Sequence, residues 1–180
     1  MKLFKYEGYK ITISEEALLL KPFKAIWKRD KSLNKEKALS ELGFIYFFCD
    51  IRSDYQYIVD EEARMASIKE GEGMPEDWTP DSVVLEAMQF YSTFKSTSAL
   101  LLEDTSYAVD KLRKLLREID LTKTDDKGKP IYTLNTITAT IKQVPSLVKD
   151  LDEAERSIAK EIAQSDKVRG AQSKSIYEDL

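Results

Sequence analysis

The chain has 180 residues, of which 42% are hydrophobic and 33% charged, and its formal net charge is −4. With only six glycines and five prolines, this composition is typical of one globular domain rich in regular structure. The absence of histidine removes the commonest general base and metal ligand, and the single cysteine, Cys49, excludes an intrachain disulfide.

The charges are unevenly distributed along the chain. The net charge is +3 over residues 1–50, −8 over residues 51–104 and +1 over residues 105–180. An acidic middle argues against a nucleic-acid clamp, which needs a basic face, so we expect no sequence-specific nucleic-acid partner. No apolar run has the length of a membrane span or of a signal peptide, so we expect a soluble protein made in the cytoplasm, with no membrane partner.

Apolar and polar residues alternate weakly near the N-terminus, with Leu3, Tyr6, Tyr9, Ile11 and Ile13 as the apolar set. This pattern predicts a short β hairpin or an extended arm over residues 1–13. Two short strands alone are marginally stable in water. We therefore expect this arm to lie on a larger body, either its own or that of a neighbouring subunit.

Cap residues and amphipathic faces predict a series of short helices in the next part of the chain. Ser14 is the expected cap of the first, Pro22 opens the second, and Asn34 is the expected cap of the third. The third contains the apolar run 44–48, so we expect it to be central. The expected helices cover residues 15–20, 23–29, 35–50 and 60–70, followed by a loop at 71–77.

A longer periodic stripe follows, and it predicts one helix over about 80–120. Thr79 is the expected N-cap, and Pro80 suits the first helical position. Serines and threonines between residues 96 and 106 weaken the stripe, so a kink or break can occur there. The stripe fits either the core helix of a bundle or a coiled-coil strand between subunits. Its members recur in steps of three and four: Val84, Ala87, Tyr91, Phe94, Ser98, Leu101, Thr105, Ala108, Leu112, Leu115 and Ile119.

The sequence of the C-terminal third of the chain predicts a loop, a final helix and a tail. Residues 122–130 form a polar turn, 131–134 are strand-like, and a helix covers about 136–164, where Pro145 is expected to kink or divide it. Its apolar stripe can pack antiparallel on the 80–120 helix. The sequence thus predicts a mainly α protein: an N-terminal arm over 1–13, a helical bundle over 14–164 around one long helix, and an extended C-terminal arm over 165–180.

The sequence carries no catalytic fingerprint. Without histidine, the serines and the cysteine lack the usual general base, and no glycine-rich phosphate loop is present. The nearest approach to a helical metal pair is Asp152 with Glu155, a spacing typical of a solvated face. We therefore expect neither an enzyme nor a bound cofactor or metal ion.

The layout resembles the head-to-tail adaptor or ring proteins of tailed bacteriophages. The shared features are a strand-like arm, a very long helix, a projecting loop and a C-terminal tail. The Lys- and Tyr-rich texture of residues 21–55 is similar to virion proteins of phages infecting Bacteroidetes, the crAss-like group included. In that family a helical bundle forms a ring below the portal, and the C-terminal arm reaches the portal.

The resemblance implies two sets of partner-binding residues. The C-terminal set would anchor the arm, and the N-terminal set would contact a neighbouring subunit. They are Ile176, Tyr177 and Leu180, and Phe4, Tyr6 and Tyr9, respectively.

The function expected from these observations is that of a virion structural protein. It would be a head–tail connector subunit, located in the virion, that forms a homo-oligomeric ring and binds the portal and neighbouring ring or tail proteins. The alternatives are a cytoplasmic helical interaction module or a phage assembly chaperone, and, less favoured, a carboxylate-metal enzyme.

Overall fold

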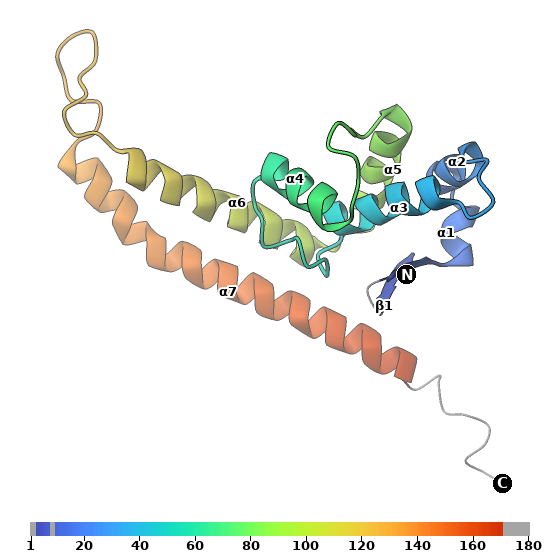
Figure 1. Cartoon of the computed structure of the whole chain (residues 1–180). Helices are drawn as coiled ribbons and strands as arrows, with labels where there is room; N and C mark the ends of the chain where they lie inside the picture. The colour runs from blue at the N-terminus through green and yellow to red at the C-terminus, as the bar shows by residue number, and fades with distance from the viewer. Residues whose placement is uncertain (1–2, 8–9, 171–180) are drawn as a thin grey trace. The chain divides into compact units, whose positions relative to one another are not determined.

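The computed structural model describes residues 3–7 and 10–170, with the side chains of 5–7, 10 and 165–170 not described. The protein is mainly helical, as the sequence predicts, with a short two-stranded hairpin near the N-terminus (Figure 1). It divides into two compact units, residues 1–95 and 96–180, and each is described separately below. Four of the predicted partner-binding residues lie outside the described ranges: Tyr9, Ile176, Tyr177 and Leu180.

The first unit contains the N-terminal hairpin and the shorter helices. β1 and β2 pair antiparallel, with Phe4 opposite Ile13. The helices lie close to the predicted ranges, and α3 is the buried one, as its apolar run indicates. The elements are β1 (Phe4–Glu7), β2 (Lys10–Ile13), α1 (Glu15–Leu19), α2 (Lys21–Arg29), α3 (Glu36–Cys49), α4 (Glu61–Gly71) and α5 (Ser82–Ser92).

The core of the first unit surrounds α3, which packs against α2, α4, α5 and β2. The β hairpin packs on this core, which is one of the two placements expected for it. Phe4 is 2% exposed, and its ring lies 5.5 Å from that of Phe23 in an edge-to-face arrangement. Gly43 permits a close approach of the hairpin, because a Cβ at that position would lie 3.3 Å from the Cδ1 atom of Ile11.

The observed cap residues of α1, α3 and α5 agree only in part with those predicted from the sequence. Ser14 caps α1 as expected. The cap of α3 comes from Asp30 instead of Asn34, since the Ala38 amide donates to the Asp30 carboxylate at 3.0 Å. α5 begins at Ser82, and its cap is Asp81, which accepts from the amides of Val83 and Val84, in place of the expected Thr79.

The predicted 80–120 helix is divided into α5 and α6 (Thr97–Glu118). Hydroxyl groups end one helix and start the next. Thr93 donates to the Phe90 carbonyl at 2.7 Å, and Ser96 accepts from the Ala99 amide as the N-cap of α6. Such local side-chain hydrogen bonds compete with the backbone hydrogen bonds of a continuous helix. The boundary between the two units falls at this break, between residues 95 and 96.

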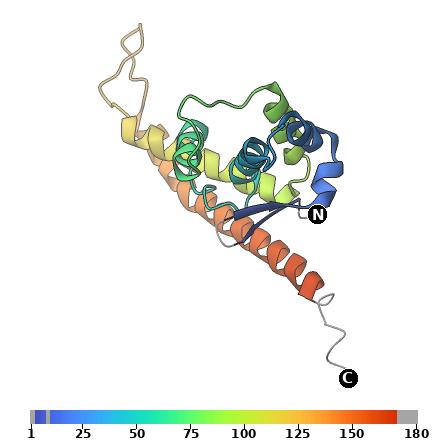
Figure 2. The same cartoon turned by 45° about the vertical axis from the view of Figure 1, so that its right-hand side comes forward.

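The second unit is a helical hairpin of α6 and α7 (Leu134–Gly170), which run side by side and antiparallel in both views (Figures 1 and 2). α7 is one element that continues through Pro145, which lies on its exposed side, where water can replace the lost hydrogen bond. It also extends to Gly170, so residues 165–170 are helical and not part of an extended arm.

Candidate protein-binding surface

The helical hairpin of the second unit has well-defined ends. At its open end, Ser96 donates to the Glu161 carboxylate at 2.7 Å, and the hydroxyls of Ser98 and Ser157 lie 3.2 Å apart. The hydroxyls of Ser98 and Ser96 lower the pKa of Glu161. These bonds fix the register of α6 against α7 at this end.

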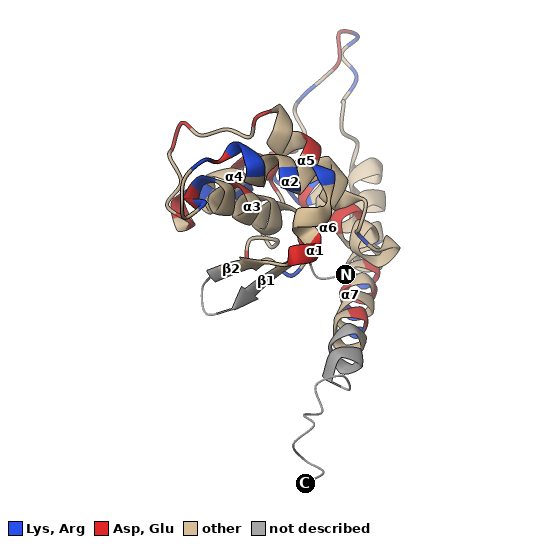
Figure 3. Cartoon of the chain, turned by 90° about the vertical axis from the view of Figure 1, so that its right-hand side faces the viewer, with Lys and Arg blue, Asp and Glu red and all other residues tan. Residues whose placement is uncertain are grey.

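The closed end is the loop between the two helices, which carries both acidic and basic residues (Figure 3). A bridge pairs Thr124 with Pro130, within the polar turn expected over residues 122–130. The Asp125 carboxylate accepts from the amides of Lys127 and Lys129 at 2.9 and 2.8 Å, and Gly128 adopts a positive φ of 74°. The loop is therefore built from local turn chemistry.

One face of α6 is half-buried, and we call it the inner stripe. It repeats in steps of three and four, as expected for a helix packed along a partner helix, here α7. The inner stripe consists of Ser98, Leu102, Thr105, Val109, Leu112, Leu116 and Ile119. Four of these positions belong to the stripe predicted from the sequence, and the other three are shifted by one residue.

The three predicted positions that are not in the inner stripe are exposed. With two charged residues they form an outer stripe on another face of α6: Leu101, Asp104, Ala108, Lys111 and Leu115. Leu100 and Tyr107 lie beside it on the helix. Leu101 and Tyr107 are each 56% exposed, Leu100 is 46% exposed and Leu115 is 43% exposed. Regularly spaced apolar groups in water are typical of a surface that binds another protein.

The charges of the hairpin are separated along its length. The open-end half, residues 97–110 and 150–164, has eight acidic and two basic residues. The closed-end half, residues 111–118 and 134–149, has six basic and one acidic. This surface would accept a partner whose charges are arranged in the opposite order along its length.

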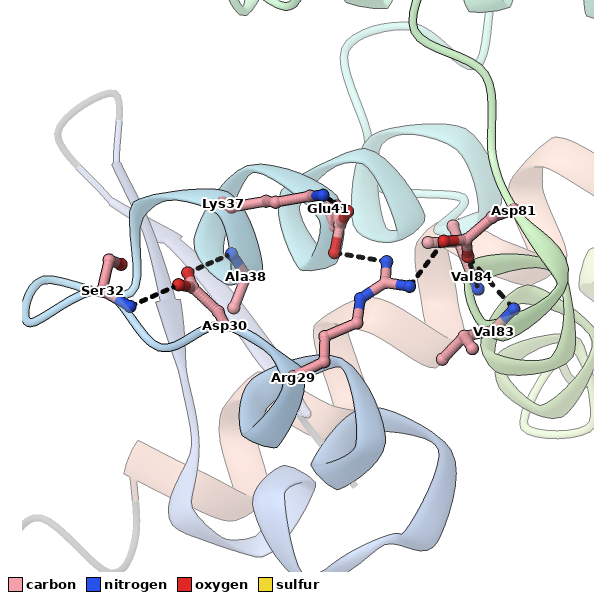
Figure 4. A network of polar contacts seen from close by, with 9 residues as sticks. All are labelled: Arg29, Asp30, Ser32, Lys37, Ala38, Glu41, Asp81, Val83 and Val84. Atoms are coloured by element: carbon pink, nitrogen blue, oxygen red, sulfur yellow. Dashed lines mark hydrogen bonds and ion pairs between the residues drawn. The ribbon is translucent and has the colours of Figure 1, made fainter.

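Two polar networks in the first unit are candidate sites of another kind. In one, Arg29 forms ion pairs with Glu41 at 2.6 Å and with Asp81 at 2.5 Å, joining α2, α3 and the cap of α5 (Figure 4). Burial raises the pKa of Asp81, but the Val84 amide and Arg29 outweigh it, so the pKa is lowered. These groups are paired in charge across three elements, as in a structural network.

The second network lies at the end of α3. Asp50 is 5% exposed and accepts bonds from Arg52, at 2.6 Å from its Nη2 atom, and from the Tyr91 hydroxyl. Burial raises the pKa of Asp50, but the bonds from Arg52 and Tyr91 outweigh it and lower the pKa overall. Burial beside the Asp50 carboxylate raises the pKa of Tyr91. The carboxylate is thus kept charged and fully engaged.

The residues predicted to bind partners have different locations. The ring of Phe4 lies in the core of its own unit, so in this conformation it is not available to a neighbouring subunit. Tyr6 lies in β1, paired with Ile11, and its side chain is among those not described. The predictions for Tyr9, Ile176, Tyr177 and Leu180 concern residues outside the described ranges. None of these residues belongs to the outer stripe. The sequence predicted Leu101, Ala108 and Leu115 as members of one stripe and did not separate an exposed face of the helix from a packed one.

Asp152 and Glu155 are both exposed on α7. Within the described residues, no three histidine, cysteine or acidic side chains are grouped so that they could hold a metal ion. Among the described helices, none combines the length and the apolar character that crossing a membrane requires.

No protein-family model, curated protein or solved structure matches the chain.

Proposed function

We propose that the protein is a structural subunit of a tailed-phage particle, at the head–tail connector, and that it joins other subunits through the α6–α7 hairpin. The observation that carries this proposal is the exposure of the outer stripe. Large apolar side chains at regular helical spacing are costly to leave in water and become stable when another protein covers them.

The finer part of the proposal, the connector ring and the portal as partner, is supported by the resemblance in layout. A hairpin of two long helices with a projecting loop suits a subunit that contacts several neighbours. The C-terminal residues after Gly170 would then reach the portal. The virion is the expected location of such a protein.

Mass spectrometry of purified particles from cells that encode the chain tests this role. We expect the chain in finished particles in a fixed ratio to the portal protein. A variant with Leu101→Glu and Leu115→Glu should be lost from particles, because charge on the outer stripe opposes burial against a partner. Lys142→Glu, at an exposed position of α7, is the matched control and should be incorporated normally. Absence of the unmodified chain from finished particles would contradict the connector role.

A second candidate is a dimeric helical interaction module or assembly chaperone. The charge separation of the hairpin favours it, because neighbours in a ring around the tail axis point the same way and would bring like-charged halves together. This candidate predicts a chain that accompanies assembly intermediates but is missing from finished particles, which the same measurement distinguishes.

A further inference from the structure

The outer stripe of α6 has the spacing of a second helix-packing seam. Leu101, Asp104, Ala108, Lys111 and Leu115 follow one another in steps of three and four, and all five are exposed. A helix with such a seam packs along a second helix over its whole length. Within the second unit, α6 packs on α7 while the residues of the outer stripe stay exposed, so this face can bind another chain.

The order of residues in the outer stripe is complementary to that of a second copy of α6 in the antiparallel direction. Ala108 is at the centre, with leucine at both ends and one charge of each sign between. If a copy of α6 is laid on it in the antiparallel direction about Ala108, Leu101 lies opposite Leu115 of the second copy. Asp104 then lies beside Lys111 of the second copy, and the same pair forms again on the other side of the axis. In the parallel direction, Asp104 would meet Asp104 and Lys111 would meet Lys111, which is repulsive.

We propose that two copies of the chain pair through the outer stripe in antiparallel order, with a two-fold axis close to Ala108. This inference rests on the proposed role of the hairpin as a protein-binding surface, which the connector subunit and the dimeric module share, and names a second copy of the chain as the partner. A two-fold pair of this kind matches the dimeric module and not the contact between neighbours in a ring. A two-fold contact buries the same patch on both copies, so each favourable pair occurs twice. The small side chain of Ala108 lets the two helices approach closely at the axis.

The surroundings of the stripe fit the same arrangement. Leu100 and Tyr107 extend its apolar surface, and the Lys111 ammonium lies 5.2 Å from the centre of the Tyr107 ring. The antiparallel order also brings the acidic half of each hairpin toward the basic half of the other.

Sedimentation equilibrium of the full chain and of charge-reversed variants tests the pairing. We expect the unmodified chain to form a dimer. Lys111→Glu or Asp104→Lys alone should weaken the dimer roughly 30-fold, since each turns two attractive pairs into two repulsive ones. The double variant, with both substitutions, should recover most of the lost affinity, because the pairs are restored with their signs exchanged.

The control variant is Lys142→Glu, which makes the same charge change in the same half of the hairpin but on α7. It should leave the dimer affinity unchanged, and circular dichroism of every variant should show an unchanged helix content. A chain that stays monomeric at all concentrations would overturn the proposal, as would a double variant no tighter than the single ones. The proposed function has a separate test, because incorporation into particles does not depend on whether the double variant recovers.

Discussion

At the scale of single residues, the buried carboxylates of the first unit are paired with arginines whose side chains are partly exposed. The Glu41 side chain is 3% exposed and depends on Arg29, while Lys37 lies 4.0 Å away and is largely exposed. Removing one member of such a pair leaves a charge without compensation in a poorly solvated place.

Arg29→Met should therefore lower the free energy of unfolding of the first unit by about 3 kcal/mol. Adding Glu41→Gln should recover part of this loss, because a neutral amide is less costly to bury than an unpaired carboxylate. Urea unfolding followed by tryptophan fluorescence measures both effects, since Trp27 and Trp78 lie in this unit. Equal stability of the single variant and the unmodified protein would show that the pair contributes little.

The cap of α3 predicts a dependence of stability on pH. The amides of Ala38 and then Ser32 donate to Asp30 and lower its pKa from 3.8 to about 2. A lowered pKa in the folded state stabilises the protein above the unfolded pKa, and this contribution is lost as the pH falls from about 4 to about 2. Asp30→Asn should flatten that part of the stability curve, as measured by urea unfolding across this pH range. An unchanged slope would contradict the assignment.

The caps show what local sequence can and cannot reveal. Ser14 could be predicted because a serine directly before a helix accepts from its first amides. Asp30 could not, since its carboxylate lies eight residues before the amide that it caps and only the folded loop brings them together. Thr79 and Asp81 are both good cap residues, and the structure chooses Asp81, which also binds Arg29.

At the scale of elements, the main uncertainty in the sequence concerned which face of α6 packs on α7. Leu101 and Leu102 are neighbours, as are Leu115 and Leu116, so the sequence alone supports two stripes one residue apart. The structure buries the second member of each pair more than the first. A single stripe needs only one leucine from each pair. The second leucine of each pair was therefore the sequence feature that could have revealed the outer stripe.

This assignment predicts a difference between two neighbouring substitutions. Leu116→Ala should destabilise the hairpin by about 1–2 kcal/mol, as expected for a half-buried leucine. Leu115→Ala should have a much smaller effect at concentrations low enough to keep the chain monomeric. Hydrogen-exchange mass spectrometry of peptides from α6 and α7 measures the local stability directly. The reverse order of effects would mean that the inner stripe is assigned to the wrong face.

At the scale of the whole molecule, the chain divides into two units. Residues 1–95 contain the apolar core, and residues 96–180 contain the α6–α7 hairpin. The sequence predicted the mainly helical class and the buried α3 correctly, because both depend on local periodicity. It left open whether the N-terminal hairpin lies on its own body or on a neighbour's, because the contact between Phe4 and Phe23 depends on tertiary packing. The partners of the chain stay a prediction.

The two units should respond separately to a core substitution. Phe4→Ala should lower the free energy of unfolding of the first unit by about 3–5 kcal/mol, because a buried ring is removed and a cavity remains. Tryptophan fluorescence should report this loss, while hydrogen exchange in α6 and α7 should change little. A loss of protection in both helices equal to that in the first unit would show that the protein unfolds as one cooperative unit.

The most specific feature of the proposed assembly is that the outer stripe of α6 binds a second copy in antiparallel order. Disulfide cross-linking tests it directly, with single cysteines introduced at residues 101, 108 and 115 after Cys49→Ala. We expect a cross-linked dimer for Ala108→Cys alone and for a mixture of Leu101→Cys with Leu115→Cys, but not for Leu101→Cys by itself. Efficient cross-linking of Leu101→Cys to itself, or no cross-link at position 108, would contradict it.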